Sequence, residues 1–428
     1  MIAGFIAALK VLQFHTVHLR SRARILKWQE RHLRAMVHHA IENVPLYAEL
    51  YARAGIESAS IKMLDDLERL PILNKQTFIG RSTDEYMDNS RPFWPVWEST
   101  SGTSGTPFTF LLGRNALNAR YLDSICFRFL TWLQPWRMEF SRVKVARIKI
   151  RSRSLPYRLF IPVATYLSDP HEAVRSLAAF QPYVLESYAS ILLMLANVVE
   201  SNPDLPKIRP GFIVSFGEIL TPAAREQLRE VFECDVYDRY GIEEMSVVAC
   251  ECRLHNGQHV HSESIIAEVV DEEGRRLREG EYGRIVLTDL TNTSMPFIRY
   301  ETGDYGRMTW EPCPCGLKTP RVWFEGRYAA VVVIKGKTIH HLEFDAALDT
   351  FMHVIRQYQI AKVSESGLEI RIATGGRYMP DDEQRILNAI RPLVGEEVQL
   401  TLKIMDEIPV TPRGKCKILV DESVLANG

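Results

Sequence analysis

Apolar side chains recur at helical spacing in several segments of this chain. The first segment covers residues 25–54, where Pro45 interrupts the repeat. Thr221 followed by Pro222 is typical of a helix start, because threonine caps the first turn and proline fits its first position. We therefore expect helices over 25–54, 116–132, 174–199 with a break at Gln181-Pro182, 221–232, 342–351 and 381–394.

Shorter apolar runs between these helices predict strands. Residues 143–150 alternate apolar and basic side chains, which indicates a strand with one basic face. Strands that alternate with helices favour an α/β sheet, whereas runs separated by turns such as 271–274 favour antiparallel pairing. The expected strands are 108–112, 143–150, 212–216, 236–240, 265–270, 283–288, 308–310, 331–334, 358–363, 368–372 and 398–404.

A domain boundary is expected near Gly326-Arg327-Tyr328. The roughly 100 residues after it have the length of a small domain and read as a compact α+β unit. The predicted fold class is therefore α/β, with a large N-terminal domain of mixed sheets and helices over 1–327 and a small α+β C-terminal domain over 328–428.

Charge and cysteine content narrow the classes of function. The 428 residues carry 52 Lys plus Arg against 53 Asp plus Glu, a net charge of -1, which argues against a dedicated nucleic-acid binder. The seven cysteines are odd in number and unevenly spaced. This usage indicates a reducing compartment, the cytoplasm, with a local metal site more than a disulfide framework.

The N-terminal segment MIAGFIAALKVLQF is apolar but interrupted by Lys10. It lacks a basic region before the apolar run and is too short to span a bilayer, so we expect neither a signal peptide nor a membrane span. A helix packed on the body is one interpretation. The other is an amphipathic contact of residues 1–20 with a membrane or a partner, including a second copy in a homodimer.

The stretch ESTSGTSGTPF at 98–108 gathers hydroxyls around two glycines. Glycines permit close backbone approach, consecutive N–H groups form a concave anion nest, and hydroxyls add donors to phosphate oxygens. No Gly-Lys-Ser/Thr ends the stretch, so it is not a Walker loop. The alternative is a surface turn. The candidate phosphate-binding residues are Ser101, Gly102, Thr103, Ser104, Gly105 and Thr106.

Four later stretches complement this loop. They are Phe216-Gly217-Glu218, YDRYGIEE at 237–244, RYETGD at 299–304 and VTPRGKCK at 410–417. They supply aromatics at a strand end, carboxylates in turns and a basic loop near the C-terminus. Each alone is usually only a turn.

Together, and in this order, the stretches resemble the adenylate-forming superfamily, which includes acyl- and aryl-CoA synthetases. LRAMVHHAIENVPLYAELYARAG at 33–55, LPILNK at 70–75 and QPYVLESYAS at 181–190 are similar to its phenylacetate–coenzyme A ligase branch, with the CapK-like relatives. PFIRYETGD, CPCG, FEGR and PRGKCK add to the resemblance, which runs from about residue 30 to 420. It implies ATP, Mg²⁺ and coenzyme A as partners of a small-molecule carboxylic acid, by default an aryl or arylacetic acid.

The resemblance also implies residue roles. The Ser101–Thr106 loop would hold the pyrophosphate end of ATP, and Glu244 would bind Mg²⁺, a hard ion suited to carboxylates. Tyr240 would stack on adenine, with Gly217, Glu218 and Asp238 in the same nucleotide site, and Asp304 would accept hydrogen bonds from the ribose hydroxyls. Arg327 would contact ribose or phosphate. Lys415, on a C-terminal domain that swings about a hinge, would bridge the acyl carboxylate and the α-phosphate.

Three departures from the family pattern leave alternatives open. Ala329 and Ala330 stand where relatives usually carry acidic residues, and Thr106 stands where many have lysine. A glycine-rich segment of the large domain is missing, near the basic stretch 137–160. One alternative is an adenylating ligase that transfers the acyl group to an amine or hydroxyl. The other is a non-catalytic nucleotide-binding relative.

Cysteines and histidines also cluster, and thiolates with imidazoles suit tetrahedral Zn²⁺. Some members of the branch carry a structural zinc here. We expect Cys252, His259, Cys313 and Cys315 as ligands, because the Asn256-Gly257 turn could bring His259 back to the thiols. Cys250, His255 or His261 could substitute for one of them. The alternative is a set of small buried thiols beside a loop.

Overall fold

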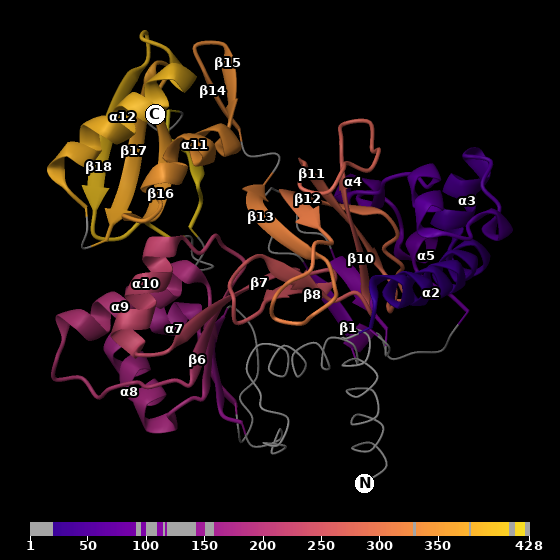
Figure 1. Ribbon diagram of the computed structural model, residues 1–428, viewed down its shortest axis with the longest axis horizontal. Coiled ribbons are helices and arrows are strands. Elements are labelled where there is room, and N and C mark those ends of the chain that lie inside the picture. The colour runs from indigo at the N-terminus through magenta and orange to yellow at the C-terminus, as the bar shows by residue number, and fades with distance from the viewer. Residues whose placement is uncertain are drawn as a thin grey trace. The chain divides into compact units, whose positions relative to one another are not determined.

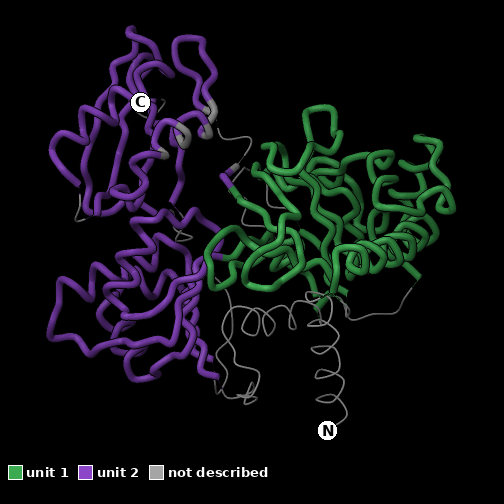
Figure 2. Tube along the Cα trace, in the orientation of Figure 1, with its two compact units in different colours: residues 1–138, 239–324 green, residues 139–238, 325–428 purple. Residues whose placement is uncertain are grey.

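Packing divides the chain into two compact units, shown in green and purple in Figure 2. Unit 1 comprises 1–138 and 239–324, and unit 2 comprises 139–238 and 325–428. The structure is a computed structural model that describes residues 20–90, 96–99, 109–113, 116–117, 143–149, 158–327, 331–375, 378–410 and 416–423. The domain boundary expected at residue 327, where the hinge of the C-terminal domain would lie, stays a prediction.

The N-terminal helices of unit 1 break where the sequence predicts it. Helix α2, Arg22–Asn43, ends before Val44, and α3, Pro45–Arg53, begins on the proline. A proline at the first helical position loses no intrahelical hydrogen bond, so a new helix starts there. The buried face of α2 packs into the core of unit 1 through Leu33, Met36, Val37 and Ala40. Short elements follow: η1 Ser58–Ser60, η2 Leu64–Arg69, α4 Lys75–Phe78, α5 Thr83–Tyr86 and the antiparallel pair β1 Val96–Ser99 and β2 Thr109–Leu112.

Six further strands of unit 1 form a run in the order β10-β11-β12-β13-β9-β8. The pairings β10–β11, β11–β12, β13–β9 and β8–β9 are antiparallel, as expected for this region. The bounds are β8 Ser246–Glu251, β9 Gln258–Val260, β10 Ile265–Val270, β11 Tyr282–Asp289, β12 Tyr300–Thr309 and β13 Arg321–Arg327.

Strand β12 begins eight residues earlier than the strand expected at 308–310, so that expectation is wrong in its start. The early part of β12 reads as a turn because it contains Thr302, Gly303 and Gly306. Tertiary packing explains the glycine at position 306, because a Cβ there would lie 2.2 Å from the Trp323 carbonyl oxygen. Close approach of two strands therefore demands a residue that sequence patterns associate with turns.

Strands of unit 2 pair in the order β4-β3-β5-β6-β7, of which β6 and β7 are labelled in Figure 1. The pairings β3–β4, β3–β5 and β5–β6 are parallel, and helices intervene along the chain. The bounds are β3 Val145–Lys149, β4 Arg158–Pro162, α7 Val163–Ser168, α8 Pro170–Phe180, β5 Val184–Ser187, α9 Ala189–Ser201, β6 Phe212–Phe216 and α10 Pro222–Phe232. Strand β7, Asp235–Ile242, begins in unit 2 and ends in unit 1. As expected, Thr221 caps α10 by accepting a hydrogen bond from the Ala224 N–H.

Strand β5 corrects the prediction of a broken helix over 174–199. Its four residues are fully buried between β3 and β6. A strand buried on both faces shows no apolar–polar alternation, and this one is shorter than the helices that flank it. The apolar residues of β5 therefore read as a continuation of the helical pattern on either side.

The C-terminal residues of unit 2 form an α+β arrangement with a four-stranded sheet in the order β18-β17-β16-β19. Strands β14 and β15 form a separate antiparallel pair. The bounds are β14 Val331–Ile334, β15 Lys337–His340, α11 His341–Leu348, η4 Asp349–Phe351, β16 Ile355–Ser364, β17 Gly367–Thr374, α12 Pro380–Val394, β18 Gln399–Met405 and β19 Leu419–Asp421. The predicted α/β fold class with a C-terminal α+β region is thus confirmed.

Membrane contact through residues 1–20 stays a prediction, because residues 1–19 lie outside the described part of the chain. The predicted helix over 116–132 also lies outside it beyond residue 117. Among the described residues, no helix combines the length and the apolar character that a membrane span requires.

Candidate active site

Two tyrosines and two carboxylates form a reciprocal pair of hydrogen bonds in unit 1. The Tyr240 hydroxyl donates to Asp304 Oδ2 at 2.8 Å, and the Tyr300 hydroxyl donates to Glu244 Oε1 at 2.8 Å. Each segment thus supplies a tyrosine and, four residues later, the carboxylate that accepts from the tyrosine of the other. We call these four residues the tyrosine–carboxylate brace.

The brace is buried: Tyr240, Glu244, Tyr300 and Asp304 are 3 to 7% exposed. A buried carboxylate needs hydrogen-bond donors, because removal from water penalises its charge. Each phenol supplies one such donor and fixes the direction of the carboxylate. The arrangement therefore holds two acidic groups at defined positions.

The Tyr240 ring has an aromatic neighbour. It stacks on the ring of Phe324, which lies on β13, with centroids 5.3 Å apart and planes inclined by 15°. Offset stacking of this kind orients the ring as well as burying it. Backbone geometry also contributes, since Gly303 adopts φ +76° and the Thr302 hydroxyl accepts from the Asp304 N–H at 3.0 Å.

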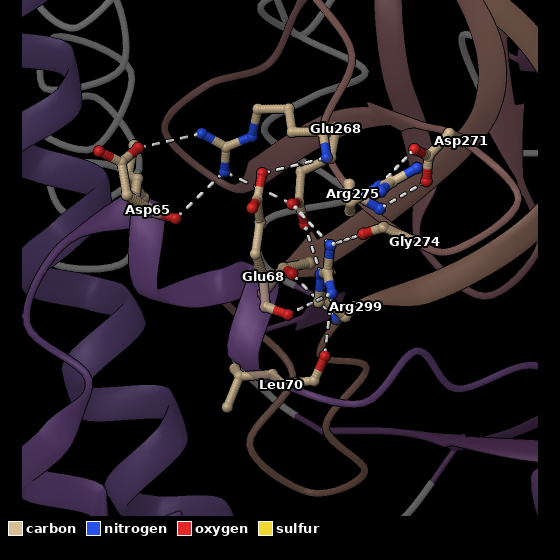
Figure 3. A network of polar contacts seen from close by, with 11 residues as sticks. Asp65, Glu68, Leu70, Glu268, Asp271, Gly274, Arg275 and Arg299 are labelled. Carbon is tan, nitrogen blue, oxygen red and sulfur yellow. Dashed lines mark hydrogen bonds and ion pairs between the residues drawn. The ribbon is translucent and has the colours of Figure 1, made fainter.

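Arg299 anchors the start of strand β12, directly before Tyr300 (Figure 3). Its guanidinium pairs with Glu268 through Nε–Oε2 and Nη2–Oε1 distances of 3.3 Å. It also donates to the carbonyl oxygens of Leu70 at 2.9 Å and Gly274 at 2.7 Å. Arg299 and Glu268 are 2% and 1% exposed.

The backbone around Arg299 is held as firmly as its side chain. Arg299 has φ +51°, a left-handed conformation that is unfavourable for a residue with a Cβ and persists where surrounding contacts enforce it. Its N–H donates to the Thr288 hydroxyl. Leu73 bonds the chain on both sides of Tyr300, because its N–H donates to the Arg299 carbonyl oxygen and its carbonyl oxygen accepts from the Glu301 N–H. These contacts fix the path of the chain that carries Tyr300 and Asp304.

Glu218 and Asp238 lie in unit 2. Gly217, at φ +72°, turns the chain after β6 and places Glu218, which accepts from the Ser190 N–H at 2.8 Å and from the Ser190 hydroxyl at 3.0 Å. Glu218 also accepts from the Cys416 N–H at 2.6 Å. Asp238 is half-buried on β7. Their predicted place in a nucleotide site stays a prediction.

Several predicted site residues lie outside the described residues. These are the whole loop from Ser101 to Thr106 and the predicted catalytic Lys415. Arg327 ends strand β13, and only its backbone is described. Ala329 and Ala330, which depart from the family pattern, also lie outside the description.

The four predicted metal ligands come together in unit 1. The ligand atoms of Cys252, His259, Cys313 and Cys315 all lie within 4.8 Å of one another. The Cys252 and Cys313 sulfurs are 3.8 Å apart, which equals the spacing of about 3.8 Å that two thiolates have around a tetrahedral Zn²⁺. The Cys315 sulfur lies 3.4 Å from His259 Nε2. Three thiols and one imidazole at these distances fit a closed zinc shell.

The surroundings of this Cys3His cluster support ligand chemistry. A hydrogen bond from Cys315 and another from His259 lower the pKa of Cys252, which favours the thiolate that binds metal. His259 Nδ1 lies 3.3 Å from the Thr319 hydroxyl, which orients its Nε2 toward the sulfurs. The expected turn is present: Gly257 has φ +78°, and a Cβ there would meet the Trp323 ring at 2.7 Å. His255, an alternative ligand, lies instead 3.0 Å from Glu251.

Comparison with known proteins gives relatives over nearly the whole chain. The chain is 25% identical over 435 residues to a phenylacetate–coenzyme A ligase of Thermus thermophilus, covering 94% of this chain and 97% of that protein. It is 20% identical to protein CapK of Staphylococcus aureus, covering 67% and 64%. A solved 2-hydroxyisobutyryl-CoA ligase matches with a TM-score of 0.75 at 20% identity, covering 96% of this chain and 92% of that one. No family model matches the chain.

The chain is similar to the phenylacetate–coenzyme A ligases and CapK, a branch of the adenylate-forming superfamily. The match to the Thermus ligase extends from end to end, and the solved ligase has the same fold. The resemblance drawn from the sequence motifs is therefore confirmed.

The sequence patterns assign no role to three residues of this site. Tyr300 and Phe324 occur within motifs that resemble the family, and no pattern predicts a role for Arg299. A readable signal existed for Tyr300, because it precedes Asp304 by four residues as Tyr240 precedes Glu244. No pattern in the sequence links Arg299 to Glu268, since the pairing depends on how β10 and β12 pack.

Proposed function

We propose that this chain is an AMP-forming acid–thiol ligase. In the first half-reaction a carboxylate oxygen of the acid attacks the α-phosphorus of ATP, and pyrophosphate leaves. In the second, the thiol of coenzyme A attacks the acyl carbon, and AMP leaves. The ligases among the relatives and the tyrosine–carboxylate brace support this proposal.

The brace is the observation that carries the proposal. A carboxylate and a triphosphate repel each other, so the first step needs cations and donors placed before the substrates meet. Glu244 would hold Mg²⁺, which supplies the positive charge on the phosphate oxygens. Asp304 would accept from two ribose hydroxyls, a task for a fixed acceptor-only group. The phenols of Tyr240 and Tyr300 keep both carboxylates oriented.

The proposal also covers the identity of the acid and of the acceptor. We infer an aryl or arylacetic acid, because the curated ligases that match act on phenylacetate by name. Acid-dependent exchange of labelled pyrophosphate into ATP tests the first half-reaction with phenylacetate, benzoate and 2-hydroxyisobutyrate. We expect the wild-type chain to exchange pyrophosphate into ATP with one of these acids, and the Lys415→Ala variant to show no such exchange. No exchange with any of them would contradict the proposal and favour a non-catalytic nucleotide-binding relative.

Consumption of coenzyme A thiol tests the acceptor with the acid that exchanges fastest. Disappearance of free thiol in proportion to AMP formation is expected. Pyrophosphate release that leaves the thiol untouched and depends on an added amine or alcohol would instead assign an amine or hydroxyl acceptor.

We also propose that the Cys3His cluster binds a structural Zn²⁺. The donor set and the sulfur spacing support it. Four protein ligands would close the coordination shell, which leaves no position for substrate. The metal would then join β9 to the segment before β13 and so stabilise the sheet that carries the brace.

A further inference from the structure

One buried hydroxyl connects helix α3 to the segment that leads into Tyr300. The Tyr47 hydroxyl donates to the Pro296 carbonyl oxygen at 2.7 Å and accepts from the Ile298 N–H at 3.1 Å. Leu73 makes the same pattern with its backbone further along, where it pairs as a parallel bridge with Tyr300. The hydroxyl therefore does for this segment what a residue of a neighbouring parallel strand would do.

The Tyr47 hydroxyl has no access to water. Tyr47 is 0% exposed, and burial raises its pKa above the ordinary value for tyrosine. The group therefore stays protonated and always carries the hydrogen that the Pro296 carbonyl oxygen accepts. Because a buried backbone N–H or carbonyl group without a partner is costly, the hydroxyl defines where Pro296 and Ile298 lie.

Further bonds fix the backbone that follows. The Phe297 carbonyl oxygen accepts from the Asp289 N–H at 2.9 Å. The Arg299 N–H donates to the Thr288 hydroxyl at 3.0 Å, and the two Leu73 bonds complete the row. The first anchor in this row comes from a helix and all others come from backbone or side chains nearer the sheet. Loss of that first anchor would free the start of the segment.

The position of the backbone decides where the Tyr300 hydroxyl lies. The Tyr300 ring packs edge-on against the Phe297 ring, with centroids 5.1 Å apart and planes inclined by 67°. Phe297 lies between the two residues that the Tyr47 hydroxyl holds. A shift of this stretch would therefore move both rings, and with them the bond of 2.8 Å from the Tyr300 hydroxyl to Glu244.

We propose that Tyr47 is a positioning residue for the Mg²⁺ ligand of the first half-reaction. It acts through the segment 296–300, the Tyr300 hydroxyl and the Glu244 carboxylate. The inference rests on the proposed function, in which Glu244 holds Mg²⁺. It assigns a task in metal binding to a residue of α3, a helix that supplies no metal ligand itself.

Tyr51 supplies the matched control. It lies on the same helix, is 1% exposed, and packs edge-on against the Tyr47 ring with centroids 5.6 Å apart. Within the described part of the chain, its hydroxyl has no hydrogen-bond partner. Tyr51→Phe therefore removes the same atom as Tyr47→Phe from the same surroundings but breaks no hydrogen bond.

A second variant tests the same segment without touching α3. Thr288→Val removes the acceptor of the Arg299 N–H, and valine has nearly the shape of threonine. If the path of the segment before Tyr300 positions Glu244, this change should act in the same direction as Tyr47→Phe. Thr288→Val also decides the question if Tyr47→Phe does not fold.

The experiment compares Tyr47→Phe, Tyr51→Phe, Thr288→Val, Tyr300→Phe and the double variant Tyr47→Phe/Tyr300→Phe with the wild-type chain. Pyrophosphate exchange with the fastest panel acid gives the Mg²⁺ concentration for half-maximal rate and the KM for ATP at saturating Mg²⁺. The melting temperature is measured in parallel. A residue that only stabilises the fold would lower the melting temperature and leave the Mg²⁺ requirement of the folded protein unchanged.

We expect Tyr47→Phe to raise the Mg²⁺ concentration for half-maximal exchange by about 3- to 10-fold, no more than loss of the Tyr300 hydroxyl itself would cause. Thr288→Val should raise it by at least about twofold, and Tyr51→Phe should leave it within about twofold of wild type. The KM for ATP at saturating Mg²⁺ should not change. In the Tyr300→Phe background, Tyr47→Phe should add less than about twofold, because residues on one path to a ligand are not additive.

A wild-type Mg²⁺ requirement in folded Tyr47→Phe would overturn the proposal, even with a lower melting temperature. Full additivity of Tyr47→Phe and Tyr300→Phe would overturn it as well, because Tyr47 would then not act through Tyr300. If Tyr47→Phe does not fold, a wild-type requirement in Thr288→Val has the same meaning. Wild-type chain that exchanges no pyrophosphate with any acid would instead overturn the proposed function, and this inference with it.

Discussion

The hydroxyl of Tyr240 lies 2.8 Å from Oδ2 of Asp304, and this bond has a mirror image in the one from Tyr300 to Glu244. Two segments, 240–244 and 300–304, thereby orient each other's acidic residue. The carboxylates proposed to hold ribose and Mg²⁺ belong to one interlocked structure. Substitution of Tyr240 should therefore affect the binding of ATP, and substitution of Tyr300 should affect the binding of Mg²⁺.

Tyr240→Phe should raise the KM for ATP by about 10-fold, because a hydrogen bond to a charged group contributes roughly 1.5–3 kcal/mol. Phenylalanine keeps the stacking on Phe324, so the fold should persist. The measurement is the dependence of pyrophosphate exchange on ATP concentration, with circular dichroism as the control for folding. An unchanged KM would show that the Tyr240 bond does not prepare Asp304 for nucleotide.

Tyr300→Phe should instead weaken the binding of Mg²⁺. Removal of the donor to Glu244 leaves its carboxylate less fixed, and we expect the Mg²⁺ concentration for half-maximal exchange to rise by about 3- to 10-fold, a loss of order 1 kcal/mol. The KM for ATP at saturating Mg²⁺ should stay near the wild-type value. If the two tyrosine variants had the same effect on both ligands, the assignment of separate roles to Glu244 and Asp304 would be wrong.

The buried pair of Arg299 and Glu268 should dominate the stability of unit 1. Arg299→Met leaves the buried Glu268 with the Arg276 guanidinium at 3.4 Å. The expected loss therefore approaches, without exceeding, the about 3–5 kcal/mol that an uncompensated buried charge costs. The matched control in the same network is Arg275→Met, since Arg275 pairs with Asp271 but its side chain is 70% exposed (Figure 3). Urea unfolding should show a large loss for the first variant and an unchanged midpoint for the second. Equal midpoints would contradict the anchoring role of Arg299.

Metal removal tests the Cys3His cluster. The purified protein should contain about one zinc per chain, as expected for a four-ligand structural site. Cys252→Ser should lose the metal and lower the melting temperature, whereas Cys234→Ser, outside the cluster, should do neither. Zinc content that is unaffected by Cys252→Ser would place the metal elsewhere or exclude it.

The sequence predicted those features that depend on local chemistry. The break at Pro45, the cap at Thr221 and the Cys3His set all follow from residues close together in the chain or from ligand preference alone. Strand β5 was missed because burial on both faces removes the alternation by which a strand is read. Arg299 was missed because its partners come from three distant segments, and no spacing in the sequence records that packing.

The transfer of oxygen from acid to AMP tests the central claim most directly. The acid from the panel that exchanges fastest is labelled with ¹⁸O in its carboxylate, and the chain turns it over with ATP and coenzyme A. An acyl-adenylate intermediate requires that AMP carries one labelled oxygen from the acid. AMP without label, or label found in inorganic phosphate, would contradict the account.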